Sequence, residues 1–330
     1  MRRALIFALL ITTPVLAQKR GKSGYDLSAR AVILHDTIVY VTPSDDGQKV
    51  DEVTLGHEVI VTDHNGAWVR VFANTDTPDQ DDPDHEPEFA TDSEPTPQTG
   101  WIKDKGIVNA LTPDGDAILF GAAADLEEQA EQPHAPKGAA MGAHLLFRRV
   151  YEYFPTSPYA GEAFYRSADI RWQLQKADNS SLPSAKEQEA YLRPQLYEGE
   201  MNKIIKLYPG SSQAARAAYD KLDNKLCGDW QGLPKCPEQE TGYYLKYASD
   251  WPDSPRAPEA VYNAIYRQGV LVSMYLVDGD KKRSQFAADR VAKLTADMRT
   301  RYPASDFTRR AQSIAFRVKQ GIPIYGTDRD

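Results

Sequence analysis

The two cysteines and six histidines are the side chains best suited to chemistry here, and their spacing limits what they could do. Cys227 and Cys236 lie nine residues apart, in a stretch with two glycines and one proline. A catalytic thiol needs a nearby base, usually histidine, but all six histidines precede residue 145. In an exported chain, an even number of cysteines at short spacing indicates a disulfide, the alternatives being free thiols or a catalytic cysteine. We predict a Cys227–Cys236 disulfide.

Other signatures of catalysis are missing from the sequence. It contains no G-x-S-x-G nucleophile turn, no glycine-rich phosphate loop and no H-E-x-x-H zinc motif. Asp81, Asp82 and Asp84 could offer oxygen ligands to calcium, but they lack the spacing and the glycine of a calcium loop. A solvated acidic loop is the favoured interpretation. We therefore expect a protein that is not an enzyme, with no metal and no cofactor.

The N-terminus has the order of charges and apolar residues that is typical of a secretory signal peptide. Two arginines follow Met1, an apolar run covers residues 4–11, and small or apolar residues lead to Ala17. The run is shorter than the roughly 20 residues that span a bilayer, although a retained anchor is the alternative. We expect a signal peptide at 1–17, a linker at 18–28, and a mature chain that is periplasmic or otherwise exported and not integral to a membrane.

Charge is distributed unevenly along the chain. Residues 1–136 carry 10 Lys and Arg against 24 Asp and Glu, whereas the whole chain has a net charge of −8. Residues 76–98 alone hold nine acidic residues and five prolines, with no Lys or Arg. Such a composition buries too little apolar surface to offset the entropy of ordering, so we expect a disordered acidic insertion over residues 73–98. The acidic first half also argues against a nucleic-acid partner.

Short β-like segments fill residues 29–110. Apolar or β-branched runs occur at 31–34, 37–41, 58–62 and 67–71, and turn-forming residues separate them. Asn65-Gly66 between two of these runs predicts a tight hairpin, since both residue types tolerate positive φ. Closely spaced short strands favour a small barrel or sandwich.

Four motifs in this region resemble a bacterial SH3 domain. They are Val39-Tyr40-Val41-x-Pro43-Ser44, Leu55-Gly56 before a strand, Asn65-Gly66-Ala67-Trp68-Val69, and Thr99-Gly100-Trp101-Ile102. The resemblance covers about 80 residues and implies an all-β SH3-like barrel that binds cell-wall peptides or proteins. The acidic insertion stands where that family has only a few residues, so a standard ligand groove is altered here.

Tyr40, Trp68 and Trp101 are the candidate ligand-binding residues of this SH3-like surface. The alternative is that they fill the barrel core, as tryptophans at such strand positions often do; core packing is favoured for the two tryptophans, while Tyr40 is balanced between the two roles.

An internal repeat dominates residues 137–322. An aromatic residue, proline, a spacer and serine recur at 154–157, 208–211, 251–254 and 302–305. Small residues follow three and six positions after each serine, mostly alanines that would let two helices approach closely. Proline ends the preceding helix, serine can cap the next, and Pro158 and Pro255 are expected at the first helical position.

This repeated sequence pattern is similar to the divergent tetratricopeptide-like repeats of envelope proteins of the BamD and YbgF types. The resemblance implies an all-α solenoid of helical hairpins with a concave partner surface, preceded by a linker at 111–136 and followed by a tail at 323–330. We expect an envelope scaffold that binds protein partners through these repeats. The alternatives are a peptidoglycan-binding module on a helical stalk and an accessory subunit of an outer-membrane assembly complex.

Overall fold

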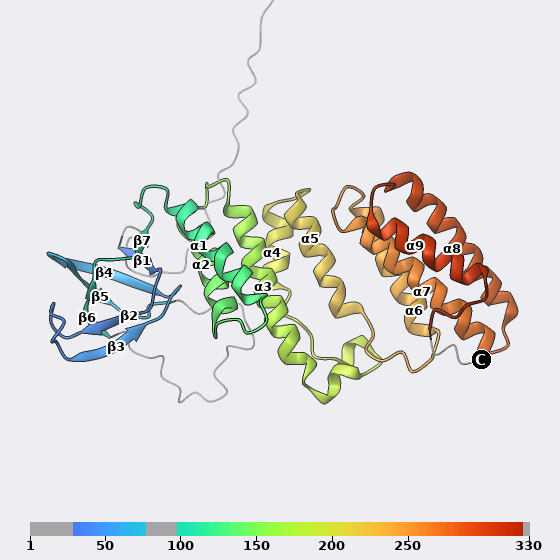
Figure 1. Ribbon diagram of the computed structural model, residues 1–330, viewed down its shortest axis with the longest axis horizontal. Helices are drawn as coiled ribbons and strands as arrows, with labels where there is room; N and C mark the ends of the chain where they lie inside the picture. Colours follow the sequence, from blue (N-terminus) through green and yellow to red (C-terminus); the bar gives the residue numbers. More distant parts are fainter. Residues whose placement is uncertain (1–28, 77–97, 326–330) are drawn as a thin grey trace, which may run out of the picture.

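The computed structural model describes residues 29–76 and 98–325, which form an antiparallel β-sheet followed by helices (Figure 1). The predicted signal peptide at 1–17, the linker at 18–28 and the Asp81–Asp84 cluster lie outside these residues, as does most of the acidic insertion and of the tail. Within the described part, no helix is long and apolar enough to cross a membrane.

One sheet contains all seven described strands. They are β1 (Arg30–Ile33), β2 (Thr37–Tyr40), β3 (Lys49–Val53), β4 (Glu58–Asn65), β5 (Trp68–Phe72), β6 (Thr99–Lys103) and β7 (Ile107–Asn109). Their order is β3-β2-β6-β5-β4-β1-β7, and every neighbouring pair is antiparallel. No ladder among the described strands joins the edges β3 and β7, so the sheet is not closed in the way that the predicted barrel requires.

The β core consists of small and β-branched residues from alternate positions of the strands. Val39, Val69, Val71 and Ile102 are fully or almost fully buried in it. Side chains alternate between the two faces of a strand, so the residues between these positions point to the opposite face. The predicted hairpin joins β4 to β5, but Asn65 still pairs with Trp68, and Gly66 (φ 61°) opens the two-residue loop.

The helices follow in chain order. They are α1 (Gly115–Ala130), α2 (Ala139–Tyr153), α3 (Ala160–Ser180), α4 (Gly199–Leu207), α5 (Ser212–Asp220), α6 (Lys235–Asp250), α7 (Ala257–Val277), α8 (Lys281–Arg301) and α9 (Asp306–Lys319), with short 3-10 turns η2 (Pro183–Lys186), η3 (Ala190–Leu192) and η4 (Lys221–Lys225). Helices that follow one another mostly pack together: α1 on α2, α2 on α3, α4 on α5, α6 on α7, and α7 on both α8 and α9.

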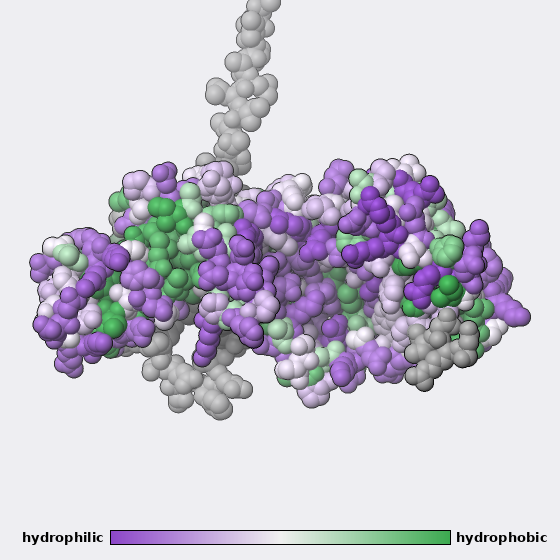
Figure 2. Space-filling model, viewed as in Figure 1, coloured by the Kyte–Doolittle hydropathy of each residue, from purple (hydrophilic) through white to green (hydrophobic). Residues whose placement is uncertain are grey.

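The prediction of a linker at 111–136 was wrong, because α1 occupies most of it. Leu119 and Ala123 are fully buried against a cluster that joins Val32 of the sheet to Phe147 of α2. The buried residues of α1 are Gly115, Leu119 and Ala123, of which only Leu119 is large, so α1 has a weak helical pattern in the sequence. Figure 2 shows hydrophobic residues gathered on this face of the molecule near α1. Leu111 and Ile118 are exposed large hydrophobic residues of this part of the chain.

The four repeat junctions have the same backbone geometry. Each aromatic residue is the C-cap of its helix, with φ between −123° and −130° and ψ between 54° and 61°, and each donates its N–H to the carbonyl four residues earlier. The four caps are Phe154, Tyr208, Trp251 and Tyr302. A shared motif in the sequence therefore produces a shared local structure.

The residues after each junction also behave alike. The small residues three and six positions after each serine are at most 3% exposed. Ser211 and Ser305 cap α5 and α9 as predicted, whereas Ser157 and Ser254 do not cap α3 and α7. The placement of Pro158 and Pro255 at the first helical position was wrong. Ala160 donates its N–H to the Ser157 carbonyl, so Pro158 occupies the second position of a turn, which proline favours, and the helix begins after it. The Ser254–Ala257 turn places Pro255 in the same way.

A buried cluster of charges fastens the sheet to the helices. Arg149 of α2 has a fully buried side chain, which contacts Asp76, Glu152 (2.5 Å) and Glu58 of β4 (3.9 Å). Tyr153 donates its hydroxyl proton to Glu58 at 2.8 Å. Removing Arg149 would take away the cation that three carboxylates share in a poorly solvated place, although Arg30 and Arg148 would still pair with Glu58 and Glu152. The sheet and α2 are therefore held by mutually dependent ionic contacts.

Asp76 belongs to this cluster although it lies at the start of the acidic segment. It accepts hydrogen bonds from the backbone N–H of Glu58 and lies 2.9 Å from the ring of His57. Burial opposes ionisation of Asp76, but His57 and the Arg149 guanidinium outweigh it and lower the pKa of the carboxyl. Ala73 is fully buried in the β core. The expectation of a disordered insertion that begins at residue 73 was therefore wrong for residues 73–76.

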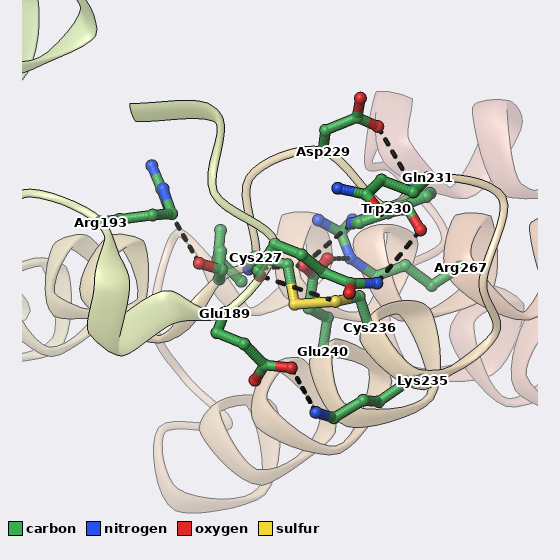
Figure 3. Close-up of a disulfide and its surroundings, with 12 residues drawn as sticks. Glu189, Arg193, Cys227, Asp229, Trp230, Gln231, Lys235, Cys236, Glu240 and Arg267 are labelled. Carbon is green, nitrogen blue, oxygen red and sulfur yellow. Dashed lines mark hydrogen bonds and ion pairs between the residues drawn. A yellow bond between two sulfur atoms is a disulfide. The ribbon is translucent and has the colours of Figure 1, made fainter. Parts of the chain in front are cut away.

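The disulfide predicted between Cys227 and Cys236 is present. It closes a loop whose Trp230 donates its indole N–H to Glu240 at 3.1 Å (Figure 3). Glu240 is almost fully buried, and it also accepts the Cys227 N–H and pairs with Arg267 of α7 at 2.6 Å. The Arg267 guanidinium also lies 5.6 Å from the centroid of the Trp230 ring, so the loop contacts both α6 and α7.

Breaking this disulfide is expected to lower the free energy of unfolding. A crosslink across about ten residues removes loop entropy from the unfolded chain that corresponds to about 2–3 kcal/mol. Unfolding of the Cys227→Ser/Cys236→Ser variant in urea, compared with the oxidised parent, measures the loss. The reduced parent serves as the control and should match the variant; an unchanged midpoint in both samples would contradict the expectation.

Candidate binding surface

Tyr40, Trp68 and Trp101 come together on the face of the sheet that points away from the β core. Tyr40 of β2 lies opposite Trp101 of β6, and Trp101 lies opposite Arg70 of β5. Trp68 is two residues before Arg70, so the alternation of the strand places it on the same face. Three neighbouring strands thus contribute one aromatic residue each to what we call the aromatic face, defined by Tyr40, Trp68 and Trp101.

The expectation that the two tryptophans fill the core was wrong. The β core is built from Val, Ile and Ala, and none of the three aromatic residues belongs to it. Each of them is half-buried and keeps part of its ring in solvent. Because the core residues occupy the alternate positions Val39, Val69 and Ile102, a strand cannot turn its tryptophan inward without exposing them.

Ring contacts hold part of this face in place. The rings of Tyr40 and Trp68 meet edge to face, with centroids 5.6 Å apart and planes at 88°. The Lys103 ammonium lies 5.6 Å from the centroid of the Trp68 ring and 2.7 Å from Asp45. The hydrogen bond with Asp45 raises the pKa of Lys103. This lysine is therefore a charged neighbour of the aromatic face.

Gly100 explains why the Thr-Gly-Trp motif brings Trp101 to Tyr40. A Cβ atom at residue 100 would lie 2.4 Å from a Val39 methyl and 2.7 Å from the Tyr40 carbonyl oxygen. Both distances are shorter than real Cβ contacts, and one of the two atoms belongs to the backbone. Only glycine allows β6 to approach β2 this closely, and this approach sets the two aromatic rings on neighbouring strands.

Sequence reasoning missed the polar residues around the rings. Arg70 and Lys103 share the face because each lies two residues from one of the tryptophans, and Asp45 reaches it from the turn after β2. The alternation of apolar Val69 and Val71 with Trp68 and Arg70 could have predicted that Arg70 shares a face of the strand with Trp68. Nothing in the sequence placed Asp45 beside Lys103, because they are far apart along the chain.

The side chains on this surface are suited to binding a ligand by stacking and by charge. Partly exposed aromatic rings stack on flat or apolar groups, while Arg70, Lys103 and Asp45 offer charges of both signs. Among residues 29–76 and 98–325, no three His, Cys, Asp or Glu side chains form a group that could hold a metal ion.

No protein-family model matches the chain, and no curated protein matches it significantly.

Proposed function

We propose that the chain is an exported adaptor of the cell envelope, which binds the wall or a wall-associated protein through its sheet and a second protein through its helices. In this proposal the sheet is an SH3-like module and the helices are a tetratricopeptide-like array. The seven-stranded antiparallel sheet with its core of Val, Ile and Ala supports the first assignment. The four equivalent aromatic caps, each followed by buried small residues, support the second.

The aromatic face is the observation that carries the proposal. Tyrosine and tryptophan are rigid, and they combine a large apolar surface with a hydrogen-bonding tip, so they recur at binding surfaces. Here three such rings stay partly in solvent although the core beneath them is complete without them. Their retention on a solvent-facing sheet is explained by a ligand that covers them.

The Arg149 cluster supports the joining role. It connects β4 with α2 through buried charged groups. The sheet is therefore held to the helices by fixed contacts and not only by a flexible linker. Figure 1 places the sheet and α9 at opposite ends of the molecule. An adaptor with two binding surfaces requires this kind of separation.

The aromatic face is tested by cosedimentation of the mature chain with purified peptidoglycan. We expect the parent to sediment with the wall and the Tyr40→Ala/Trp101→Ala variant to lose at least nine-tenths of that binding, because two stacking partners contribute about 1 kcal/mol or more each. The matched control is Tyr191→Ala, which removes an exposed tyrosine far from the sheet and should bind as the parent does.

The control and the pattern of binding separate the possible ligands. Circular dichroism must show that the double variant is folded. If the parent does not sediment, but retains an envelope protein that the double variant loses, the ligand of the sheet is a protein. If neither the wall nor any envelope protein depends on Tyr40 and Trp101, the proposed function is wrong.

A further inference from the structure

The strongest unassigned feature is a groove between α8 and α9. Figure 1 places these two helices at the end of the molecule opposite the sheet. Its volume is about 620 Å³, and only these two helices line it. On α8 the lining residues run from Gln285 to Arg299. At 1.5 Å per residue this corresponds to about 21 Å, or about four helical turns.

The floor of the groove has the shape and polarity of a helix-packing surface. Ala288, Ala292 and Ala296 recur every four residues along α8 and face Ala315 and Phe316 of α9. Rows of residues four apart form the ridges and grooves by which helices pack, and alanines in such a row leave space for the side chains of another helix. Phe316 is 62% exposed, although it stands beside this floor.

A buried hydroxyl lies in the wall of the groove. Thr295 lines the groove and is only 5% exposed, yet its side-chain oxygen has no hydrogen-bond partner among the described residues. That oxygen has less than 1 Å² of accessible surface, so it is enclosed by the protein and offers no contact to a molecule in the groove.

The charge around the groove determines which kind of molecule fits. Residues 281–319 contain eleven Lys and Arg against three Asp, an excess of +8 in a chain whose net charge is −8. Arg299 and Lys319 line the groove, and neither forms an ion pair within the described part of the chain. Figure 2 shows hydrophilic residues over much of this end, next to smaller hydrophobic areas.

The two cations lie at opposite ends of the groove. Arg299 is in the last turn of α8 and Lys319 is the last residue of α9, and the two helices run antiparallel as a hairpin. An occupant would therefore meet a positive charge near each end and an apolar floor between them. Asp289, the acidic residue among the lining residues, accepts a hydrogen bond from Gln285 at 2.9 Å.

We propose that this groove binds one acidic amphipathic helix of a partner protein, whose apolar side packs on the alanine row and whose carboxylates pair with Arg299 and Lys319. The inference rests on the proposed adaptor function, because it names the chemistry of the partner that the helices bind. Amphipathic helices in apolar grooves are a recurrent mode of recognition, and complementary charge sets their orientation.

The test uses a synthetic helical peptide of about 16 residues, with leucines on one side and glutamates on the other, long enough to fill four turns. Binding to the full mature chain is followed by fluorescence anisotropy of the labelled peptide. We expect saturable binding that weakens at least tenfold in Arg299→Glu/Lys319→Glu and at least tenfold in Ala292→Trp, which fills the groove. A peptide with lysines in place of the glutamates should not bind.

The matched control is Lys281→Glu/Lys293→Glu. It changes the net charge by the same amount at exposed residues of α8 that do not line the groove, and it should alter affinity less than twofold. An equal loss in both charge variants would overturn the inference, since it would indicate general attraction to a basic surface. No saturable binding, or binding that survives Ala292→Trp, would overturn it as well.

Two further measurements distinguish other occupants. Tighter binding of a peptide covering residues 76–98 would identify the acidic segment of this chain as the occupant, and dimers of the parent that Ala292→Trp abolishes would identify a second copy; either result overturns the inference. The groove variants leave the aromatic face unchanged. Wall or protein binding that still depends on Tyr40 and Trp101 would therefore show that the adaptor function stands while the groove inference fails.

Discussion

Replacing Arg149 with alanine is expected to lower the free energy of unfolding by about 3–5 kcal/mol, the usual effect of removing one partner from a buried ion cluster. The Arg149 side chain is fully buried and contacts Asp76, Glu152 and Glu58. Without it, three carboxylates would remain close together, where burial makes each charge costly. Urea unfolding followed by circular dichroism measures the loss.

The pKa values in this cluster agree with that expectation. Burial opposes the charge on Arg149, but Glu152 and the neighbouring acidic groups outweigh it and raise its pKa. Burial likewise opposes ionisation of Glu152, while Arg149 and Arg148 lower its pKa below the usual value. A carboxyl with a lowered pKa in the folded state stabilises the fold above the unfolded pKa, near 4, and this contribution is lost as the pH falls further.

A surface ion pair supplies the control for Arg149. Lys246 pairs with Asp250 four residues later on α6, and both side chains are largely exposed. Lys246→Ala should change the free energy of unfolding by less than about 0.5 kcal/mol, because water screens such pairs. If Arg149→Ala lost no more than this control, the buried cluster would not be what holds the sheet to α2.

Asp220 is the second position where a single substitution should have a large effect, this time in the stabilising direction. Asp220, the last residue of α5, is only 7% exposed, and the Tyr165 hydroxyl donates a hydrogen bond to it at 2.8 Å. Burial, and then the nearby charge of Asp169, raise the pKa of Asp220 to about 7. Arg256 and the Tyr165 hydrogen bond offset part of this effect.

We expect Asp220→Asn to stabilise the protein at pH 8. The folded state binds this proton more tightly than the unfolded state, so the parent loses stability as the pH rises from about 4 to about 7, up to about 4 kcal/mol in all. Asparagine removes the buried charge and keeps an oxygen that accepts the Tyr165 hydroxyl. The advantage of the variant should shrink by about 2–3 kcal/mol between pH 8 and pH 5.

Urea unfolding of parent and variant at both pH values provides the measurement. The control is Asp250→Asn, which removes an exposed carboxylate and should show the same difference from the parent at pH 5 and pH 8. The low-pH contribution of Asp76 and Glu152 cancels in these comparisons, because every protein retains both residues. An Asp220→Asn advantage that does not depend on pH would show that Asp220 is already ionised in the folded protein at pH 5.

Local features were predictable where the signal lies within a few consecutive residues. The aromatic-Pro-x-Ser junctions were correctly assigned as helix ends, because proline stops a helix wherever it stands. The apolar run at 67–71 after Asn65-Gly66 likewise predicted a strand, and β5 lies there. The helix α1 was not predicted from the sequence. Its few buried residues are covered by the sheet and by α2, which a local pattern does not reveal.

The sequence by itself determined the order of a β-rich region and a helical repeat, the Cys227–Cys236 pairing and the three aromatic candidates. Only the tertiary structure decided that those rings face solvent, that Arg149 joins the sheet to α2, and that α8 and α9 leave a groove. The reason is physical. Helix ends, strands and a short disulfide loop depend on neighbouring residues, whereas burial, ion clusters and grooves depend on which distant surfaces the fold brings into contact.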